Sequence, residues 1–159
     1  MATKIVTVEV STTLNLTMSG TSTVSGTITW SAPQAPAGGT LVHINLAGTW
    51  RWTGKQQVRW ININGTQTTS ETSFDIQVST TAKTSQSVTA QGNHKNCTGK
   101  NWTNNIKAVY YYEVEVQEAM FFKQNGSWVQ ATKCFIKTNG AWVETDPTAV
   151  PQKNWVKGT

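Results

Sequence analysis

The sequence has few charged residues and few side chains of the kinds that catalyse reactions. Only 13% of its 159 residues are charged, and it contains two histidines and two cysteines. Catalysis needs converging groups with tuned proton affinities, and this chain offers little material for such a site. We therefore predict that the protein is not an enzyme and that it needs no cofactor.

The two histidines give no clear sign of a metal or catalytic site. His94 and Cys97 have a spacing that zinc ligands can adopt, but no second ligand pair accompanies them. His43 falls within an expected strand, where a structural role is more common than that of a general base. We predict no metal site and no catalytic residue.

Long hydrophobic runs are also missing. No stretch of about 18 consecutive apolar residues occurs, and residues 1–10 lack the basic, apolar and small-residue segments of a secretory signal. We expect no membrane-spanning helix and folding in a cytoplasm. In that compartment Cys97 and Cys134 should stay reduced, although a disulfide between them remains the alternative.

The basic residues do not form a run. The net charge is +5, from 13 Lys and Arg against 8 Asp and Glu, and the positive side chains are scattered along the chain. Proteins that bind nucleic acids usually gather such charges against successive phosphates. We expect no nucleic-acid partner.

The residues that are abundant favour β-structure. Threonine is the most frequent residue, and helix formers such as Leu, Glu and Ala are sparse. Alternating apolar and polar residues indicate strands at 4–10, 14–18, 24–30, 41–47, 73–78 and 102–116. We expect an all-β fold, with an immunoglobulin-like β-sandwich over residues 1–118. A β-barrel is the alternative, because strand pairing is not visible in a sequence.

Proline, glycine and polar residues predict the connections between the strands. Residues 33–39 contain two prolines and two glycines and should form a loop. Residues 48–64 are expected to form a hairpin with its turn near Gly54, and Asn64-Gly65 marks the next turn. Residues 79–100 are polar, with Val88 as their one strand-like apolar residue, and we expect one edge strand and a long loop there.

The aromatic residues Trp50 and Trp52 share one side of their strand, and two interpretations are open. If the turn near Gly54 has an odd number of residues, Val58 and Trp60 join them and the cluster is a core. If the turn has two residues, Arg59 lies beside them instead and the rings form a platform on which a sugar could stack. We favour the core. The platform would make the protein a carbohydrate-binding module, with Trp50, Trp52 and Arg59 as its site and a host glycan as its partner.

An internal repeat lies in residues 119–146. Phe122 to Val129 and Ile136 to Val143 both contain Lys-x-Asn-Gly-x-Trp, with a period of 14 residues. Asn-Gly is the strongest short signal for a hairpin, because both residues tolerate the positive φ of a type I′ turn. The turns predict that Lys123 faces Trp128 and that Lys137 faces Trp142.

The two hairpins should expose more apolar surface than they can bury. If Thr132-Lys133 is a turn, the four strands form one meander with apolar side chains on both faces. So small a sheet needs cover from another surface. The alternative is that lysine stems lie over the tryptophan rings on a solvated face. We predict a protein interface, to which a C-terminal arm at 147–159 contributes Trp155. The predicted interface residues are Phe121, Lys123, Trp128, Phe135, Lys137, Trp142 and Trp155.

The tandem Lys-x-Asn-Gly-x-Trp hairpins, Lys123 to Trp128 and Lys137 to Trp142, resemble the C-terminal repeats of small structural proteins of tailed bacteriophages, such as tail, collar and decoration components. The resemblance covers residues 121–145. It implies a virion protein that assembles with copies of itself or with other virion proteins.

Overall fold

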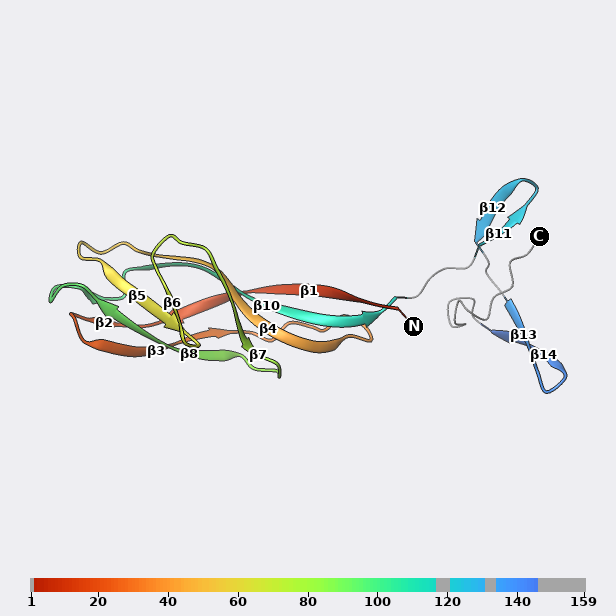
Figure 1. Ribbon diagram of the computed structural model, residues 1–159, viewed down its shortest axis with the longest axis horizontal. Coiled ribbons are helices and arrows are strands. Elements are labelled where there is room, and N and C mark those ends of the chain that lie inside the picture. The colour runs from red at the N-terminus through yellow and green to blue at the C-terminus, as the bar shows by residue number, and fades with distance from the viewer. Residues whose placement is uncertain (1, 117–120, 131–133, 146–159) are drawn as a thin grey trace. The chain divides into compact units, whose positions relative to one another are not determined.

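The computed structural model describes residues 2–116, 121–130 and 134–145 (Figure 1). Two compact units divide the chain: Ile5–Val114, and residues 1–4 together with 115–159. Every regular element in the described ranges is a β-strand, so the all-β expectation is confirmed. No helix in these ranges is long and apolar enough to cross a membrane.

The larger unit is built on one eight-stranded sheet with the order β6-β5-β8-β3-β1-β10-β4-β7. All of the strand pairs described in it are antiparallel. A small separate pair, β2 with β9, lies beside it. The strands are β1 (Thr3–Asn15), β2 (Met18–Ser19), β3 (Thr23–Trp30), β4 (Thr40–Trp52), β5 (Val58–Ile63), β6 (Thr66–Thr68), β7 (Phe74–Ser79), β8 (Ser85–Gly92), β9 (Thr98–Gly99) and β10 (Trp102–Glu115).

The sheet folds over into two layers whose ends are joined by side chains. The Asn64 side chain, in the turn between β5 and β6, donates a hydrogen bond from Nδ2 to the carbonyl of Gln77 in β7 at 2.9 Å. A second hydrogen bond joins β4 to β6, because Trp50 Nε1 donates to Thr68 Oγ1 at 2.8 Å. The result is the expected β-sandwich, nearly closed in the manner of a barrel (Figure 1).

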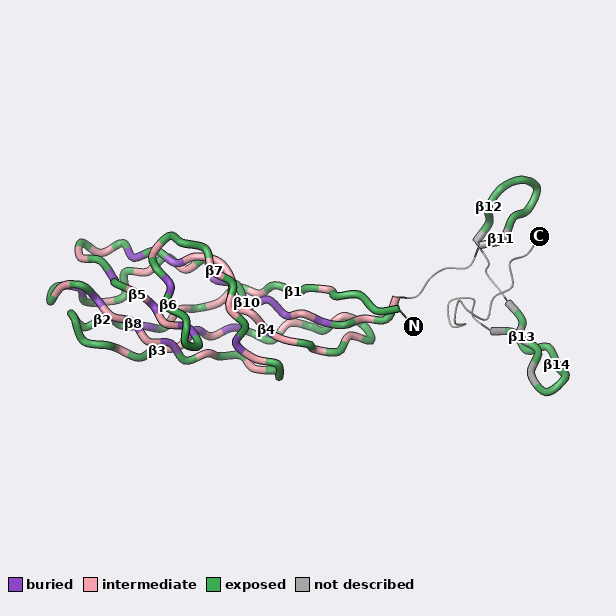
Figure 2. The backbone as a smooth tube through the Cα atoms, viewed as in Figure 1, coloured by how far each residue is buried: buried purple, intermediate pink, exposed green. Residues whose placement is uncertain are grey.

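The core follows the alternation of the strands. On β10, Ile106, Ala108, Tyr110 and Tyr112 are buried, as their shared parity in the sequence predicts. Apolar residues from the other layer meet them, including Ile28 and Ile61, which are fully buried. Buried positions accordingly lie inside the sandwich along its length (Figure 2).

Three expectations about strands and connections are wrong. Residues 48–64 do not form a hairpin: β4 pairs with β7 and β10, whereas β5 pairs with β6 and β8. The segment around Gly54 therefore crosses between the two layers, and this lets both strands bury apolar side chains in one core. Residues 4–10 and 14–18 were expected to be two separate strands, but β1 runs without a break from Thr3 to Asn15, and Thr12 pairs with Trp30 within it.

The third error concerns residues 79–100. We expected an edge strand, but β8 lies between β3 and β5 inside the sheet. Its inward residues Val88 and Ala90 are small, and the residues between them are polar, so its hydrophobic signal is weak despite its central position. The expected loop at residues 33–39 is confirmed.

Cys97 is a buried free thiol. It is 1% exposed, and burial raises the pKa of its thiol above the ordinary value of 9.0. The reactive thiolate is therefore scarce in the folded protein at pH 8. We predict that, in a Cys134→Ser variant, Cys97 reacts with dithionitrobenzoate at least about 100-fold more slowly in the native state than in urea. Equal rates in the two states would show that Cys97 is accessible.

Candidate protein interface

The two repeats fold into hairpins around their Asn-Gly turns. Strands β11 (Phe121–Gln124) and β12 (Ser127–Gln130) form the first, and β13 (Cys134–Thr138) and β14 (Ala141–Thr145) the second. Asn125 and Asn139 have φ of 50° and 51°, and the glycine that follows each has φ of 82°. Positive φ at both central residues is the requirement of a type I′ turn, which explains the Asn-Gly pairs.

The predicted register is confirmed in both hairpins. Lys123 pairs with Trp128 in the first, and Lys137 pairs with Trp142 in the second. Because side chains alternate along a strand, Lys and Trp share one face of each hairpin. Phe135, two residues before Lys137, belongs to that same face by register.

The expected four-stranded meander is not found among the described residues. Each hairpin is a two-stranded sheet of its own, and β12 does not pair with β13. The expected connecting turn at Thr132-Lys133 lies outside the described residues. Two-stranded hairpins are marginally stable alone in water, so each of these needs additional contacts more than a meander would.

The hairpin residues whose burial is described are exposed to solvent (Figure 2), and several of them are large and apolar. Trp128 and Trp142 are each 68% exposed, and Phe135 is 55% exposed. Lys123 and Lys137 are also exposed. Of the remaining predicted interface residues, the side chain of Phe121 and the whole of Trp155 lie outside what the structure describes.

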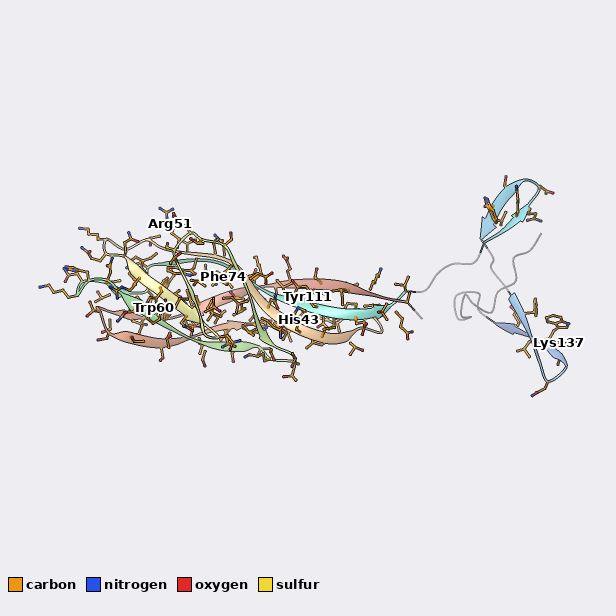
Figure 3. The ribbon with its side chains drawn as sticks, in the orientation of Figure 1. His43, Arg51, Trp60, Phe74, Tyr111 and Lys137 are labelled. Atoms are coloured by element: carbon orange, nitrogen blue, oxygen red, sulfur yellow. The ribbon has the colours of Figure 1, made fainter. Side chains whose placement is uncertain are left out.

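In the second hairpin the lysine lies near the tryptophan ring. Lys137 Nζ is 5.9 Å from the centroid of Trp142, at the outer limit of a cation–π contact (Figure 3). Such a contact at an exposed site contributes about 0.5–1 kcal/mol. Burial of one tryptophan side chain in an interface contributes a gross stabilisation of about 4 kcal/mol. The lysine contact therefore replaces little of the stabilisation that burial would give.

The sugar platform at Trp50 and Trp52 is wrong. Trp50 is fully buried and Trp52 is 4% exposed, so neither ring presents a face to solvent. Trp102 packs edge-on against both rings, at centroid distances of 5.6 and 4.7 Å. Arg59 is exposed on β5, but the rings that were to join it are in the core. The core interpretation is correct for Trp50, Trp52 and Val58, all buried, but it is wrong for Trp60, which is half-buried and does not join them.

The histidines lie in ordinary structural surroundings. His43 stacks on Tyr111 of the neighbouring strand, with ring centroids 4.2 Å apart. His94 accepts a hydrogen bond at Nδ1 from the backbone N–H of Asn96 at 3.1 Å, which occupies that nitrogen. Within the described ranges no three His, Cys, Asp or Glu side chains gather closely enough to hold a metal ion.

Comparisons with protein-family models, with curated proteins and with solved structures gave no match. The interpretation of the hairpins accordingly depends on their own geometry and chemistry.

Proposed function

We propose that the protein is a non-enzymatic structural component of a tailed-bacteriophage virion, part of the tail or of a head appendage. In this proposal the β-sandwich is the folded body, and the two hairpins attach it to a neighbouring virion protein or to another copy of the chain. The observation that carries the proposal is the equivalent placement of Trp128 and Trp142, each 68% exposed beside a cross-strand lysine.

The residue types of the hairpins suit a protein partner. Tryptophan is enriched at the energetic centres of interfaces, because it buries a large area with few rotatable bonds. Two copies of one binding element, 14 residues apart, also allow two contacts to be made by one chain. A second contact made at high effective concentration strengthens attachment without any larger interface.

The test is a double substitution, Trp128→Ala with Trp142→Ala, in the phage that encodes the chain. We expect the variant to be lost from purified particles, measured as copy number by quantitative mass spectrometry, while the melting temperature of the sandwich stays unchanged. The matched control is Ile5→Ala with Val42→Ala, which removes two exposed apolar side chains of the sandwich strands β1 and β4. That control should enter particles normally.

Two outcomes would contradict the proposal in different ways. If the unmodified chain is missing from purified particles, the assignment to a virion is wrong. If the double variant enters particles at the normal copy number, the hairpin tryptophans are not the attachment surface. Sedimentation velocity of the purified chain distinguishes a second copy from another virion protein as the partner. Only contact between copies produces oligomers when no other protein is present.

A further inference from the structure

The outer face of strands β1, β3, β8 and β5 carries an uncharged array of hydrogen-bonding side chains. Inward residues such as Ile28, Val88 and Ile61 are buried, so the alternate residues face outward. The pairing of the strands places these outward residues in four rows across the sheet. The rows are Trp60, Gln91 and Thr23; Asn62, Thr89 and Ser25; Ser87, Thr27 and Asn15; and Ser85, Thr29 and Thr13.

No charged side chain occurs in these rows. Apart from Trp60, every member is Ser, Thr, Asn or Gln. The outer face of the other layer is different, because Arg51, Asp75 and Lys107 project from β4, β7 and β10. Exposed charged residues on the same strands, Glu9 on β1 and Arg59 on β5, lie outside the rows. The absence of charge therefore belongs to the four rows and not to the whole outer face.

The middle of this face is hollowed. A groove of about 350 Å³, within the usual size range of small-ligand sites, crosses β3, β8 and β5. It is lined by Ser25, Gly26, Asn62, Asn64, Gly65, Gln86, Ser87, Val88 and Thr89. None of these lining residues is charged, although Lys83 Nζ donates to Gln86 Oε1 at 2.6 Å. Burial of a charged ligand against the neutral lining would be costly.

Several polar groups of the groove can still hydrogen-bond to a ligand. The backbone N–H of Gly65 donates to Asn62 Oδ1 at 3.0 Å, which fixes the amide and leaves its NH₂ group to donate outward. The hydroxyls of Ser25, Ser87 and Thr89 make no intramolecular hydrogen bond within the part of the chain that the structure describes. Each hydroxyl can both donate and accept, as the hydroxyls of a sugar do.

Trp60 adds an aromatic ring to the same face. It is half-buried on β5 (Figure 3). Asn62 follows two residues later, so the two side chains project from the same side of the strand. An aromatic surface beside neutral donors and acceptors is suited to a ligand that has both apolar C–H faces and many hydroxyls.

We infer that this face binds a neutral oligosaccharide, with the groove over Ser25, Thr89 and Asn62 taking the sugar hydroxyls and Trp60 stacking on an adjacent ring. This site is separate from the buried Trp50 and Trp52. It is also independent of the proposed attachment through the hairpins, since it uses other residues of another unit.

The test begins with the full chain on a glycan microarray of neutral, sialylated and sulfated oligosaccharides. The strongest neutral glycan is then titrated by isothermal calorimetry against the unmodified chain and three variants. Ser25→Glu places a charge in the groove, Trp60→Ala removes the stacking ring, and Thr103→Glu is the matched control on the outer face of the other layer. Thermal melts establish that each variant is folded.

We expect binding of neutral glycans, weakened at least about tenfold by Ser25→Glu and by Trp60→Ala and unchanged by Thr103→Glu. If Trp60→Ala does not fold, Ser25→Glu alone decides, because Ser25 is exposed and its replacement leaves the core intact. The inference is overturned if no glycan on the array is bound, if only anionic glycans are bound, or if Ser25→Glu binds as tightly as the unmodified chain. None of these results bears on incorporation into particles.

Discussion

Replacement of Trp50 by alanine should lower the free energy of unfolding of the sandwich by about 4 kcal/mol, in the usual range for loss of a buried aromatic side chain. Trp50 is fully buried, and its ring packs edge-on against Trp102. The substitution leaves a cavity and also removes the partner of Thr68 Oγ1, which receives the indole N–H at 2.8 Å. Thr68 keeps its own hydrogen bond to the carbonyl of Ile61, so the cavity is the larger part of the loss.

Urea denaturation measures this effect, provided that the m-value stays constant. Trp128→Ala is the matched control, because it removes the same side chain from a site that is 68% exposed. Its effect on the sandwich should be within about 0.5 kcal/mol. Similar losses for the two variants would mean that Trp50 is not a core anchor, and the two-layer arrangement around it would then be in doubt.

Features that depend on neighbouring residues were predictable from the sequence. Each Asn-Gly pair fixes a turn through its own backbone preferences, and a two-residue turn then fixes the register of both strands. Asn64-Gly65 behaves as the two pairs in the repeats do, with φ of 49° and 87°. The long strand β10 was predictable for a similar reason, since its alternation continues over many residues.

Features that depend on distant residues were not predictable. Whether β4 turns back on itself near Gly54 or crosses to the other layer is decided by the partners that β5 finds in β8 and β6. The site residues show the same division. The exposed Trp128 and Trp142 follow from local register, whereas the polar face needed the pairing of β1, β3, β8 and β5 before its rows could be recognised. Its only local signal is the frequency of Ser and Thr at alternate positions, which is also typical of any solvated strand.

Gly26→Ala should destabilise the sandwich by about 3 kcal/mol, since the added methyl group would overlap atoms that have little room to move. A Cβ at this position would lie 2.6 Å from Leu16 Cδ1 and 3.0 Å from Leu16 Cα, and it would also collide with the carbonyl oxygen of Asn15. Backbone atoms cannot turn aside as a flexible side chain does, so the variant must separate β3 from the end of β1.

The neighbouring Ser25→Ala is the control for this substitution. Ser25 is exposed, and its replacement should change the free energy of unfolding by no more than about 0.5 kcal/mol. Urea denaturation of the two variants separates close backbone approach from a general preference for polar residues in β3. If Gly26→Ala is as stable as Ser25→Ala, β1 and β3 are not held as closely as the register Asn15 to Thr27 requires. Asn15 and Thr27 would then be out of alignment in their row with Ser87 on the outer face of the sheet.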